Sequence, residues 1–599
     1  MEITRRTLLG TGTVAGVGLL LPLRLTEAAN AAKPVNVLTA FTEQLPTLAN
    51  LGVIDARAGG AFAISMENAT THKFHTALGA TPTFTYKSPG GTQDYLGPVI
   101  VAQKDVPFTL AVTNNLGNHP LASALDTGIM GTVALDATAP RASTHLHGGN
   151  TAPVHDGDPT DWFPSGGTTK TYTYGNTQEA AGLWYHDHAL GITRLNVIAG
   201  LASGYLIRDV NDPGDGTTGL PPAPWEVPLI LQDRMFDVNG NFVYPVNLAP
   251  PTGPYPKVWI PEFFGDVATV NGKIQPNLNV DPGKYRFRVL NGSNARFYNL
   301  KLKTSLGTVL TFSQIGTDGG LLNAPVPLTK LLLGPGERAD IVVDFAGLPP
   351  LTTVLLANDA NTPFPSGPQA VRRGGVPLRE IMQFTVTGAA GTGWQTALPP
   401  NLRAAPVTPL AGLIPQQTRS MDLVELLDPL GVPLMVLMNN TTFETTRGAP
   451  IAPMSNTLEQ WDLINTTVDA HPMHVHFTQF QVLNRQKFDS AGYLLARYGP
   501  RPANTPIWPI PDTPGTTGVL VTPYLRGTPT TPPPNEQGWK DTVVAMPGEV
   551  TRILVPFGTT IPGATGPMAI GTNYTGDYVS HCHILEHEEN DMMMRFRIV

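Results

Sequence analysis

Alternation of apolar and polar residues is the clearest pattern along the chain. In YRFRVLNG (Tyr285–Gly292), aromatic and aliphatic residues alternate with arginine before an Asn-Gly turn. The segment MRFRIV (Met594–Val599) alternates in the same way, and VPFTLAVTNNLG (Val106–Gly117) does so less regularly. A period of two predicts half-buried β-strands, whereas convincing helical periodicity is scarce. The pattern therefore predicts an all-β protein.

Two stretches rich in proline and glycine interrupt this pattern, Asn211–Pro228 and Gly388–Pro409. Such stretches are typical of linkers. A chain of 599 residues is also too long for one core, since single cores stop growing near about 250–300 residues. The linkers leave three pieces of ordinary domain size: 33–212, 227–388 and 410–599. We expect each piece to form a β-sandwich, and a Pro/Thr-rich insertion, Pro500–Pro534, to form a surface loop.

Composition agrees with this architecture and excludes one class of partner. The 61 glycines and 59 prolines favour many turns and short strands over long helices. The net charge of −8 leaves no basic stripe that could neutralise phosphates. We therefore expect no nucleic-acid partner.

Residues 1–32 have the features of an export signal. Arg5 and Arg6 precede an apolar run, Val14–Leu25, which small residues follow. The paired arginines predict a bacterial signal of the twin-arginine (Tat) type and hence a periplasmic or extracellular location. The alternative is an uncleaved membrane anchor. No other segment is long and apolar enough to span a bilayer, so we expect no membrane association after cleavage. We also expect the protein to be a monomer.

Histidine is concentrated in four short clusters: THLHGG, WYHDH, HPMHVH and HCHILEH. They hold ten of the 14 histidines, and residues 189 to 470 contain none. They also contain four His-x-His pairs, where random placement predicts fewer than one. Ordinary core positions explain His72, His75 and His119, and a loop position explains His155. Core packing does not explain four pairs.

The spacing of the pairs has a physical meaning on strands. Side chains two residues apart point to the same face of a strand, so each pair presents two imidazoles in one direction. Four converging pairs supply eight nitrogens, which suit copper, zinc, iron or nickel and are too many for one ion. The spacing predicts a multi-metal cluster that includes His145, His147, His186, His188, His474, His476, His581 and His583.

The single cysteine of the chain, Cys582, lies between two of these histidines. On a strand its side chain points away from His581 and His583 and thus toward a different metal. His587 and Met592 follow at five and ten residues, and the unpaired His471 is available. Cysteine, histidine and a weak methionine ligand are typical of a blue-copper electron-transfer site, and a thioether is a poor zinc ligand. The sequence predicts a one-electron site adjacent to a multi-metal site.

These motifs resemble the multicopper oxidase family, specifically its bacterial spore-coat-laccase and bilirubin-oxidase branch. The resemblance rests on the four histidine motifs and on WYHDHALGITRLNVIAGL (Trp184–Leu201), VNGKIQPNL (Val270–Leu278), KYRFRVLNGSNARFYNL (Lys284–Leu300) and PPPNEQGWKDTV (Pro532–Val543). It spans all three pieces and implies three consecutive cupredoxin-like Greek-key sandwiches, of which the middle one is copper-free.

The resemblance also implies four copper ions and their ligands. The type 1 ion would take His471, Cys582, His587 and axial Met592. The type 2 ion would take His145 and His474. The type 3 pair would take His147, His186 and His583 on one ion and His188, His476 and His581 on the other.

The implied activity is a laccase-like oxidation coupled to oxygen reduction. Phenolic or related aromatic reductants would lose single electrons near a solvent-facing edge of His587. The electrons would pass through Cys582 to the cluster, where four of them reduce dioxygen to water. Asp156 and Glu588 are candidate proton donors, and the alternative for both is an ordinary solvated or turn-forming acid.

Other functions remain open at this stage. A bilirubin-oxidase-like enzyme, an aminophenol-oxidising enzyme and a metallo-oxidase would use the same chemistry. A non-enzymatic blue-copper electron carrier would need only the Cys582 site, which would leave the eight cluster histidines without a role.

Overall fold

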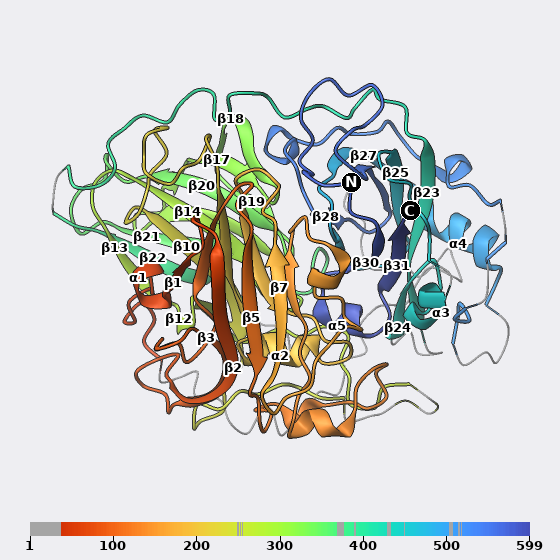
Figure 1. The fold of residues 1–599 in the computed structure, drawn as a ribbon, viewed down its shortest axis with the longest axis horizontal. Coiled ribbons are helices and arrows are strands. Elements are labelled where there is room, and N and C mark those ends of the chain that lie inside the picture. The colour runs from red at the N-terminus through yellow and green to blue at the C-terminus, as the bar shows by residue number, and fades with distance from the viewer. Residues whose placement is uncertain are drawn as a thin grey trace, which may run out of the picture.

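The computed structural model describes residues 38–247, 251, 253, 255–367, 377–388, 391–427, 433–448, 450–501, 507–512, 515–516 and 518–599. The expected export signal, 1–32, lies outside these residues. Strands dominate the described part of the chain (Figure 1), and its longest α-helix, α4, spans only Ser490–Tyr498. The all-β prediction is confirmed. None of the helices described here has the length and apolar character that crossing a membrane requires.

The first part of the chain forms two sheets, ordered β1-β4-β9-β8-β6 and β3-β2-β5-β7. Their strands are β1 (Val53–Asp55), β2 (Gly60–His72), β3 (Thr81–Lys87), β4 (Val99–Gln103), β5 (Phe108–Asn114), β6 (Thr144–His147), β7 (Thr168–Tyr174), β8 (Gly182–Asp187) and β9 (Ala202–Arg208). In β5 the apolar Phe108, Leu110 and Val112 are buried while the residues between them are half-buried. This is the period-two pattern that the sequence predicts.

The middle part forms a sheet ordered β12-β11-β10-β14-β20-β17-β18 and a second ordered β13-β22-β21-β15-β16, with β19 paired to β15. Their strands are β10 (Glu226–Arg234), β11 (Val267–Val270), β12 (Lys273–Ile274), β13 (Asn277–Val280), β14 (Lys284–Asn291), β15 (Tyr298–Thr304), β16 (Val309–Leu310), β17 (Phe312–Thr317), β18 (Gly320–Leu328), β19 (Leu331–Leu333), β20 (Arg338–Asp344), β21 (Thr353–Asn358) and β22 (Glu380–Val386).

Strand β14 differs from its prediction in one respect. The sequence predicts a half-buried strand, yet all of its residues after Lys284 are buried. The reason is an ion network on its polar face. Arg286 contacts both oxygens of Asp212, at 2.8 and 2.7 Å, and Nε of Arg288 donates to Glu226 at 2.8 Å. Arginine is tolerated in such an interior when its charge is paired and hydrogen-bonded.

The last part forms sheets ordered β24-β23-β25-β29-β27 and β28-β26-β30-β31. Their strands are β23 (Gln417–Leu427), β24 (Pro433–Met438), β25 (Leu458–Asn465), β26 (His471–Val475), β27 (Gln481–Lys487), β28 (Thr542–Ala545), β29 (Glu549–Pro556), β30 (Gly576–Cys582) and β31 (Met593–Ile598). The core between them contains Trp461, Phe557 and Phe596, together with Cys582 and Met592.

The remaining helices are short: α1 (Leu48–Leu51), α2 (Thr193–Ala199), α3 (Phe443–Gly448) and α5 (Leu585–Glu589). Helix α5 follows β30 directly and packs against α2 of the first part. The described residues of the Pro500–Pro534 insertion are mostly exposed or half-buried, which fits a surface loop.

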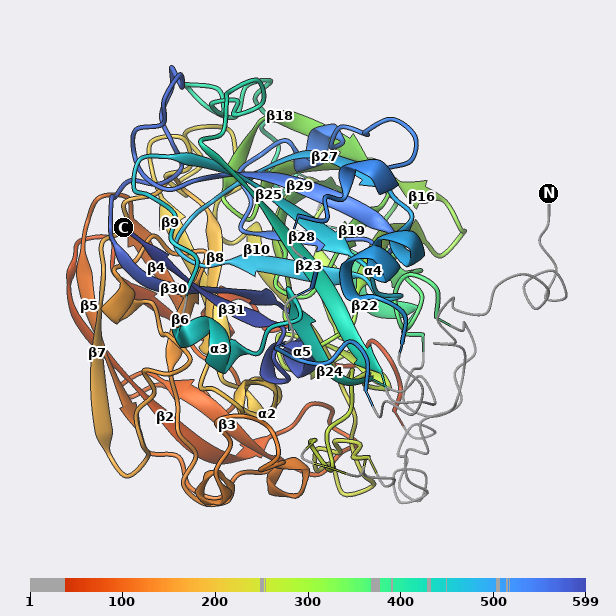
Figure 2. The same ribbon diagram turned by 90° about the vertical axis from the view of Figure 1, so that its right-hand side faces the viewer.

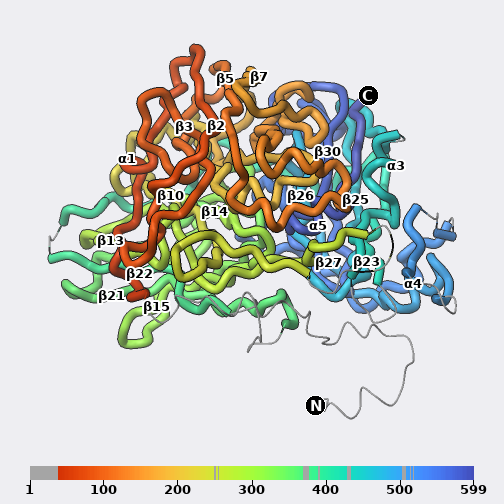
Figure 3. Tube along the Cα trace, turned by 90° about the horizontal axis from the view of Figure 1, so that it is seen from below, coloured from red at the N-terminus to blue at the C-terminus, as the bar shows by residue number. Residues whose placement is uncertain are grey.

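The three sheet pairs are consecutive along the chain and in contact in space. Their strands lie within residues 53–208, 226–386 and 417–598. Figure 2 shows β6 and β8 of the first part near β30 and β31 of the last part. The two parts are in contact, since Nε2 of His188 lies 3.3 Å from Nε2 of His581. In Figure 3 the blue part lies beside the green one, and Arg338 and Asp541 form an ion pair across that boundary.

Candidate metal centre

Two antiparallel strand pairs bring the histidine motifs together. In the first part, His145 on β6 lies opposite His186 on β8. In the last part, His474 on β26 lies opposite His581 on β30. Directly opposed residues share a face of the sheet, so each strand pair presents its histidines on one side. His188 lies just beyond the end of β8, where its backbone N–H donates to the carbonyl of Ser143 at 2.7 Å.

The histidines of the first and last parts meet face to face. The rings of His145 and His476 stack with centroids 3.8 Å apart, and those of His147 and His474 stack at 3.7 Å. All eight cluster histidines are at most 1% exposed. The convergence predicted from the His-x-His spacing is therefore present, and it occurs at the boundary between two sheet pairs.

The ligand atoms of these histidines fall into groups small enough for single ions. Within each group the nitrogen or sulfur atoms lie within 4.8 Å of one another. The groups are His145, His147 and His474; His147, His186 and His583; His188, His476 and His581; His471, Cys582 and His587; and His145, Asp156 and His476. The resemblance implies the second, third and fourth of these groups.

The orientation of the rings fits metal ligands. Nδ1 of His145, His186 and His474 lies 2.5 to 2.8 Å from a backbone carbonyl. Nε2 of each has no hydrogen-bond partner among the described residues. A buried nitrogen without a partner is costly. A metal-binding histidine typically fixes one ring nitrogen on a carbonyl and offers the other to the ion.

His147 is turned the other way around. Its Nε2 lies 3.1 Å from Oδ1 of Asp541 and 3.1 Å from Oγ1 of Thr542, and its Nδ1 has no partner among the described residues. The same principle therefore makes Nδ1 of His147 the metal-facing atom. The donor set consists of neutral imidazoles and suits copper.

Burial keeps the imidazoles in the form that binds metals. It lowers the pKa of His186 to about 3 and that of His581 to about 4. The pKa of His474 is also lowered, by burial first and then by the neighbouring histidines. The rings are therefore neutral around pH 7, and no proton has to leave before an ion binds.

A second, smaller site lies on the opposite face of β26 and β30. Nδ1 of His471 lies 3.6 Å from Sγ of Cys582, Nδ1 of His587 lies 3.8 Å from it, and the two nitrogens are 3.3 Å apart. Burial raises the pKa of the Cys582 thiol, so the thiolate needs a positive partner in this core. A bound metal ion supplies that charge.

Strand alternation separates the two sites by one peptide unit. His581 and His583 belong to the histidine groups, whereas Cys582 belongs to the group with His471 and His587. Met473, which lies opposite Cys582 on β26, belongs to the same apolar core. The predicted divergence of Cys582 from its neighbours is therefore present.

The segment after β30 folds back toward the cysteine site. The Cys582 N–H donates to the carbonyl of Met592 at 2.9 Å, and the Met592 N–H donates to the carbonyl of His587 at 2.9 Å. Met592 is fully buried beside this site. The expectation of a solvent-facing edge on His587 is wrong, because helix α5 lies inside the molecule and leaves His587 1% exposed.

The two candidate proton donors are buried and touch the cluster. Oδ2 of Asp156 lies 2.6 Å from Nδ1 of His476, and Oε1 of Glu588 lies 3.2 Å from Nδ1 of His188. Both carboxyls are 1% exposed, and burial raises the pKa of both. Neither is the solvated acid that the alternative interpretation assumes.

The scattered histidines have structural contacts. His72 lies 2.7 Å from Asp94 and 2.8 Å from the carbonyl of Gly272, and His119 lies 3.2 Å from Asn196. His75 is also buried. His155 is half-buried in a short 3-10 turn. The interpretation of these four as non-ligands agrees with their positions, since none belongs to a metal-ligand group of the described residues.

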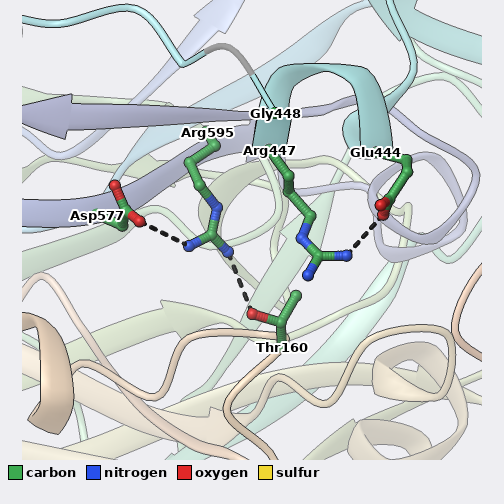
Figure 4. A pocket seen from close by; sticks show the side chains of 6 residues that line it. All are labelled: Thr160, Glu444, Arg447, Gly448, Asp577 and Arg595. Carbon is green, nitrogen blue, oxygen red and sulfur yellow. Dashed lines mark hydrogen bonds and ion pairs between the residues drawn. The ribbon is translucent and has the colours of Figure 1, made fainter.

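A polar cavity of about 300 Å³ lies apart from both metal-ligand sites. Figure 4 shows its lining residues, Thr160, Glu444, Arg447, Gly448, Asp577 and Arg595. Each arginine already has a carboxylate partner, since Arg447 pairs with Glu444 and Arg595 contacts Asp577. The cavity therefore contains no uncompensated charge that would identify a ligand.

Comparison with known proteins agrees with this geometry. A sequence profile described as multicopper oxidase matches residues 418–599. The chain is 34% identical over 582 residues to the multicopper oxidase LPR1 of Arabidopsis thaliana, covering 94% of each chain. It is 35% identical over 543 residues to a laccase of Bacillus subtilis (strain 168), covering 89% of this chain and 93% of that protein.

A solved structure supports the same assignment. The McoA multicopper oxidase of Aquifex aeolicus matches with a TM-score of 0.67 and 26% identity, covering 94% of this chain and all of that one. The sheet pairs are thus cupredoxin-like domains, and the buried histidine groups fit copper. This chain belongs to the multicopper oxidase family and is a copper-dependent oxidoreductase that uses oxygen.

Proposed function

We propose that this enzyme is laccase-like and oxidises phenols and related aromatic compounds one electron at a time at the Cys582 site. Dioxygen is reduced to water at the histidine cluster. One observation carries the proposal: Cys582 belongs to one ligand group while its two neighbours, His581 and His583, belong to others. A blue-copper electron carrier needs only the Cys582 site, so it does not explain the histidine groups that contain His581 and His583.

The ligand assignment follows the groups and the resemblance together. The type 1 copper would be held by His471, Cys582, His587 and Met592. The type 2 copper would be held by His145 and His474. The type 3 pair would be held by His147, His186 and His583 and by His188, His476 and His581. This set accounts for four copper ions per chain.

The protein residues perform three tasks around these ions. Copper, when bound, supplies the one-electron redox steps and the site of oxygen reduction. Cys582 links the two sites through its own backbone, and the surrounding core excludes water from its sulfur. Asp156 and Glu588 would supply protons to the cluster, since Oδ2 of Asp156 lies beside Nδ1 of His476 and Oε1 of Glu588 lies beside Nδ1 of His188.

The cellular location of the enzyme follows from its first residues. Arg5 and Arg6 support export by a Tat-type signal, residues 1–32, to the periplasm or beyond. The domains span 33–212, 227–388 and 410–599, and the exported enzyme is a monomer.

A metallo-oxidase is the second candidate, and one specific observation favours it. Acidic side chains gather near the Cys582 site. Burial raises the pKa of Glu262, and the charges of Asp469, Glu425 and Glu586 raise it further. The charges of Glu262 and Glu425 also act on Cys582. Clustered carboxylates suit a cationic reductant such as a divalent metal ion better than a neutral phenol.

A substrate panel on copper-loaded protein tests both candidates. Oxygen uptake would be measured with a dimethoxyphenol and with Fe²⁺, while the thiolate-to-copper absorption band is recorded. The laccase-like function predicts uptake with the phenol, and no uptake in Cys582→Ser. A preference for Fe²⁺ that Glu262→Gln removes would favour the metallo-oxidase. An intact blue band with no oxygen uptake from any reductant would identify a carrier.

A further inference from the structure

The middle domain, which supplies none of the metal-ligand groups of the described residues, touches the histidine cluster with its backbone. The turn between β19 and β20 contains Gly336 at a φ of +81°. A Cβ atom at this position would lie 2.7 Å from the ring of His583 and 3.2 Å from that of His147. The turn is therefore packed against the rings as closely as a glycine backbone allows.

Arg338, at the start of β20, extends this contact through an ion pair. Its Nη1 and Nη2 donate to the two oxygens of Asp541, each at 2.6 Å. Its Nε donates to the carbonyl of Gly182 at 3.1 Å. The Arg338 side chain thus joins all three domains, and it is almost completely buried.

Asp541 in turn contacts a histidine from each of the two copper-binding domains. Its Oδ1 lies 3.1 Å from Nε2 of His147, and its backbone carbonyl lies 2.8 Å from Nδ1 of His474. In both rings the other nitrogen is the one without a partner. Asp541 therefore fixes the plane and the tautomer of two adjacent metal-binding rings.

The two N–H groups that the Arg338 guanidinium presents side by side are essential for holding the Asp541 carboxylate. A guanidinium matches both carboxylate oxygens at once, whereas an ammonium matches one and leaves the carboxylate free to rotate. Nearby, Lys540 contacts Asp318 at 2.8 Å and Glu337 at 3.1 Å, so it is already paired and cannot replace Arg338. Without the arginine, the buried carboxylate of Asp541 would lack its bidentate partner.

We infer that Arg338 is a positioning residue of the metal centre, through which the copper-free domain sets the orientation of His147 and His474. This inference rests on the proposed function. It gives the middle domain a role beyond that of a spacer. The metal-binding rings of His147 and His474 should respond to Arg338, while the Cys582 site should not.

The test is Arg338→Lys in the full-length, copper-loaded protein. We expect an unchanged thiolate-to-copper band, an altered hyperfine splitting of the type 2 copper in electron paramagnetic resonance, and about 10–100-fold weaker retention of that copper against a chelator. Asp541→Asn, which preserves shape and removes the charge, should produce the same changes if the lysine variant does not fold. A wild-type spectrum in both variants would overturn the inference.

Arg403 provides the matched control. It donates to both oxygens of Glu179, at 2.6 and 2.7 Å, and this pair is also buried but contacts no histidine. Arg403→Lys should leave the type 2 spectrum unchanged. Equal changes of the type 2 spectrum in Arg403→Lys would indicate that losing any buried ion pair disturbs the packing of the protein, and would also refute the role of Arg338. A wild-type protein that binds no type 2 copper would refute the proposed function instead.

Discussion

At the scale of single residues, burial determines the chemistry of this protein. The cluster histidines are neutral because they are buried, and burial also raises the pKa of the carboxyls of Asp156 and Glu588. Sequence spacing predicted which histidines share a face, since that depends only on strand geometry. It did not predict that His587 is covered, because covering depends on how α5 packs in three dimensions.

Glu588 should affect the reduction of oxygen and not the oxidation of the substrate. Glu588→Gln retains the shape of the side chain but removes its proton, so steady-state turnover should fall by about a hundredfold or more. Bleaching of the blue band by a reductant under nitrogen should proceed at the wild-type rate. Equal slowing of both steps would contradict a role in proton delivery.

Met592 should tune the potential of the Cys582 site. Replacing a weak thioether ligand by the apolar Leu removes electron donation to the oxidised ion, so Met592→Leu should raise the type 1 potential in a redox titration. Met594→Leu is the control, since Met594 is also buried in the same core but lies two residues further along, on β31. A lower potential in Met592→Leu would refute the axial role.

His119 should make stability depend on pH without involving any metal. Burial lowers its pKa to about 3 in the folded state, whereas the pKa of an unfolded histidine is about 6.5. The unfolded chain therefore binds an extra proton as the pH falls from 6.5 toward 3, and stability is lost over that window. His119→Gln should reduce the drop in melting temperature between pH 7 and pH 4. An unchanged drop would contradict this assignment.

At the scale of elements, strand pairing does most of the positioning. Strands β6, β8, β26 and β30 carry the histidines within them or one residue beyond their ends, and helix α5 holds His587 against the core. The strands were predictable from alternation. The complete burial of β14 was not, because the partners of its arginines, Asp212 and Glu226, lie far away in sequence. The same is true of Asp541, whose sequence motif gives no sign of its ion pair with Arg338.

The contact between α2 and α5 should control the stability of the cysteine site. Arg194 on α2 forms a buried ion pair with Glu589 on α5. Arg194→Met leaves an unpaired buried carboxylate and should cost about 3–5 kcal/mol. In denaturant, the blue absorbance should then disappear at a lower concentration.

The double variant Arg194→Met with Glu589→Leu provides the internal comparison. It removes both charges and should recover much of the lost stability. If the double variant is no more stable than the single one, the loss does not come from the unpaired carboxylate.

At the scale of the whole molecule, the histidine groups lie where domains meet. Their side chains come from the first and last domains, and Arg338 of the middle domain pairs with Asp541 beside them. Histidine spacing predicted that ligands would converge. The resemblance, and not the spacing, implied that they do so between the first and third domains.

Removing copper should therefore weaken the association of domains. Ligand binding stabilises the folded state by an amount that grows with the ratio of free ligand to dissociation constant. Copper removal by chelation should lower the melting temperature and produce separate unfolding transitions in calorimetry. Cys582→Ser, which affects the site inside the last domain, should preserve a single transition. A single transition after copper removal would show that copper does not hold the domains together.

The meeting of His188 and His581 has a consequence for the order of events during folding. These rings are in contact although 393 positions separate them along the polypeptide. Contacts of such long range form late, because the intervening segments must first become compact. A histidine group that draws on the first and last sandwiches can therefore be complete only after these have folded and docked, so we expect copper to bind there late in folding.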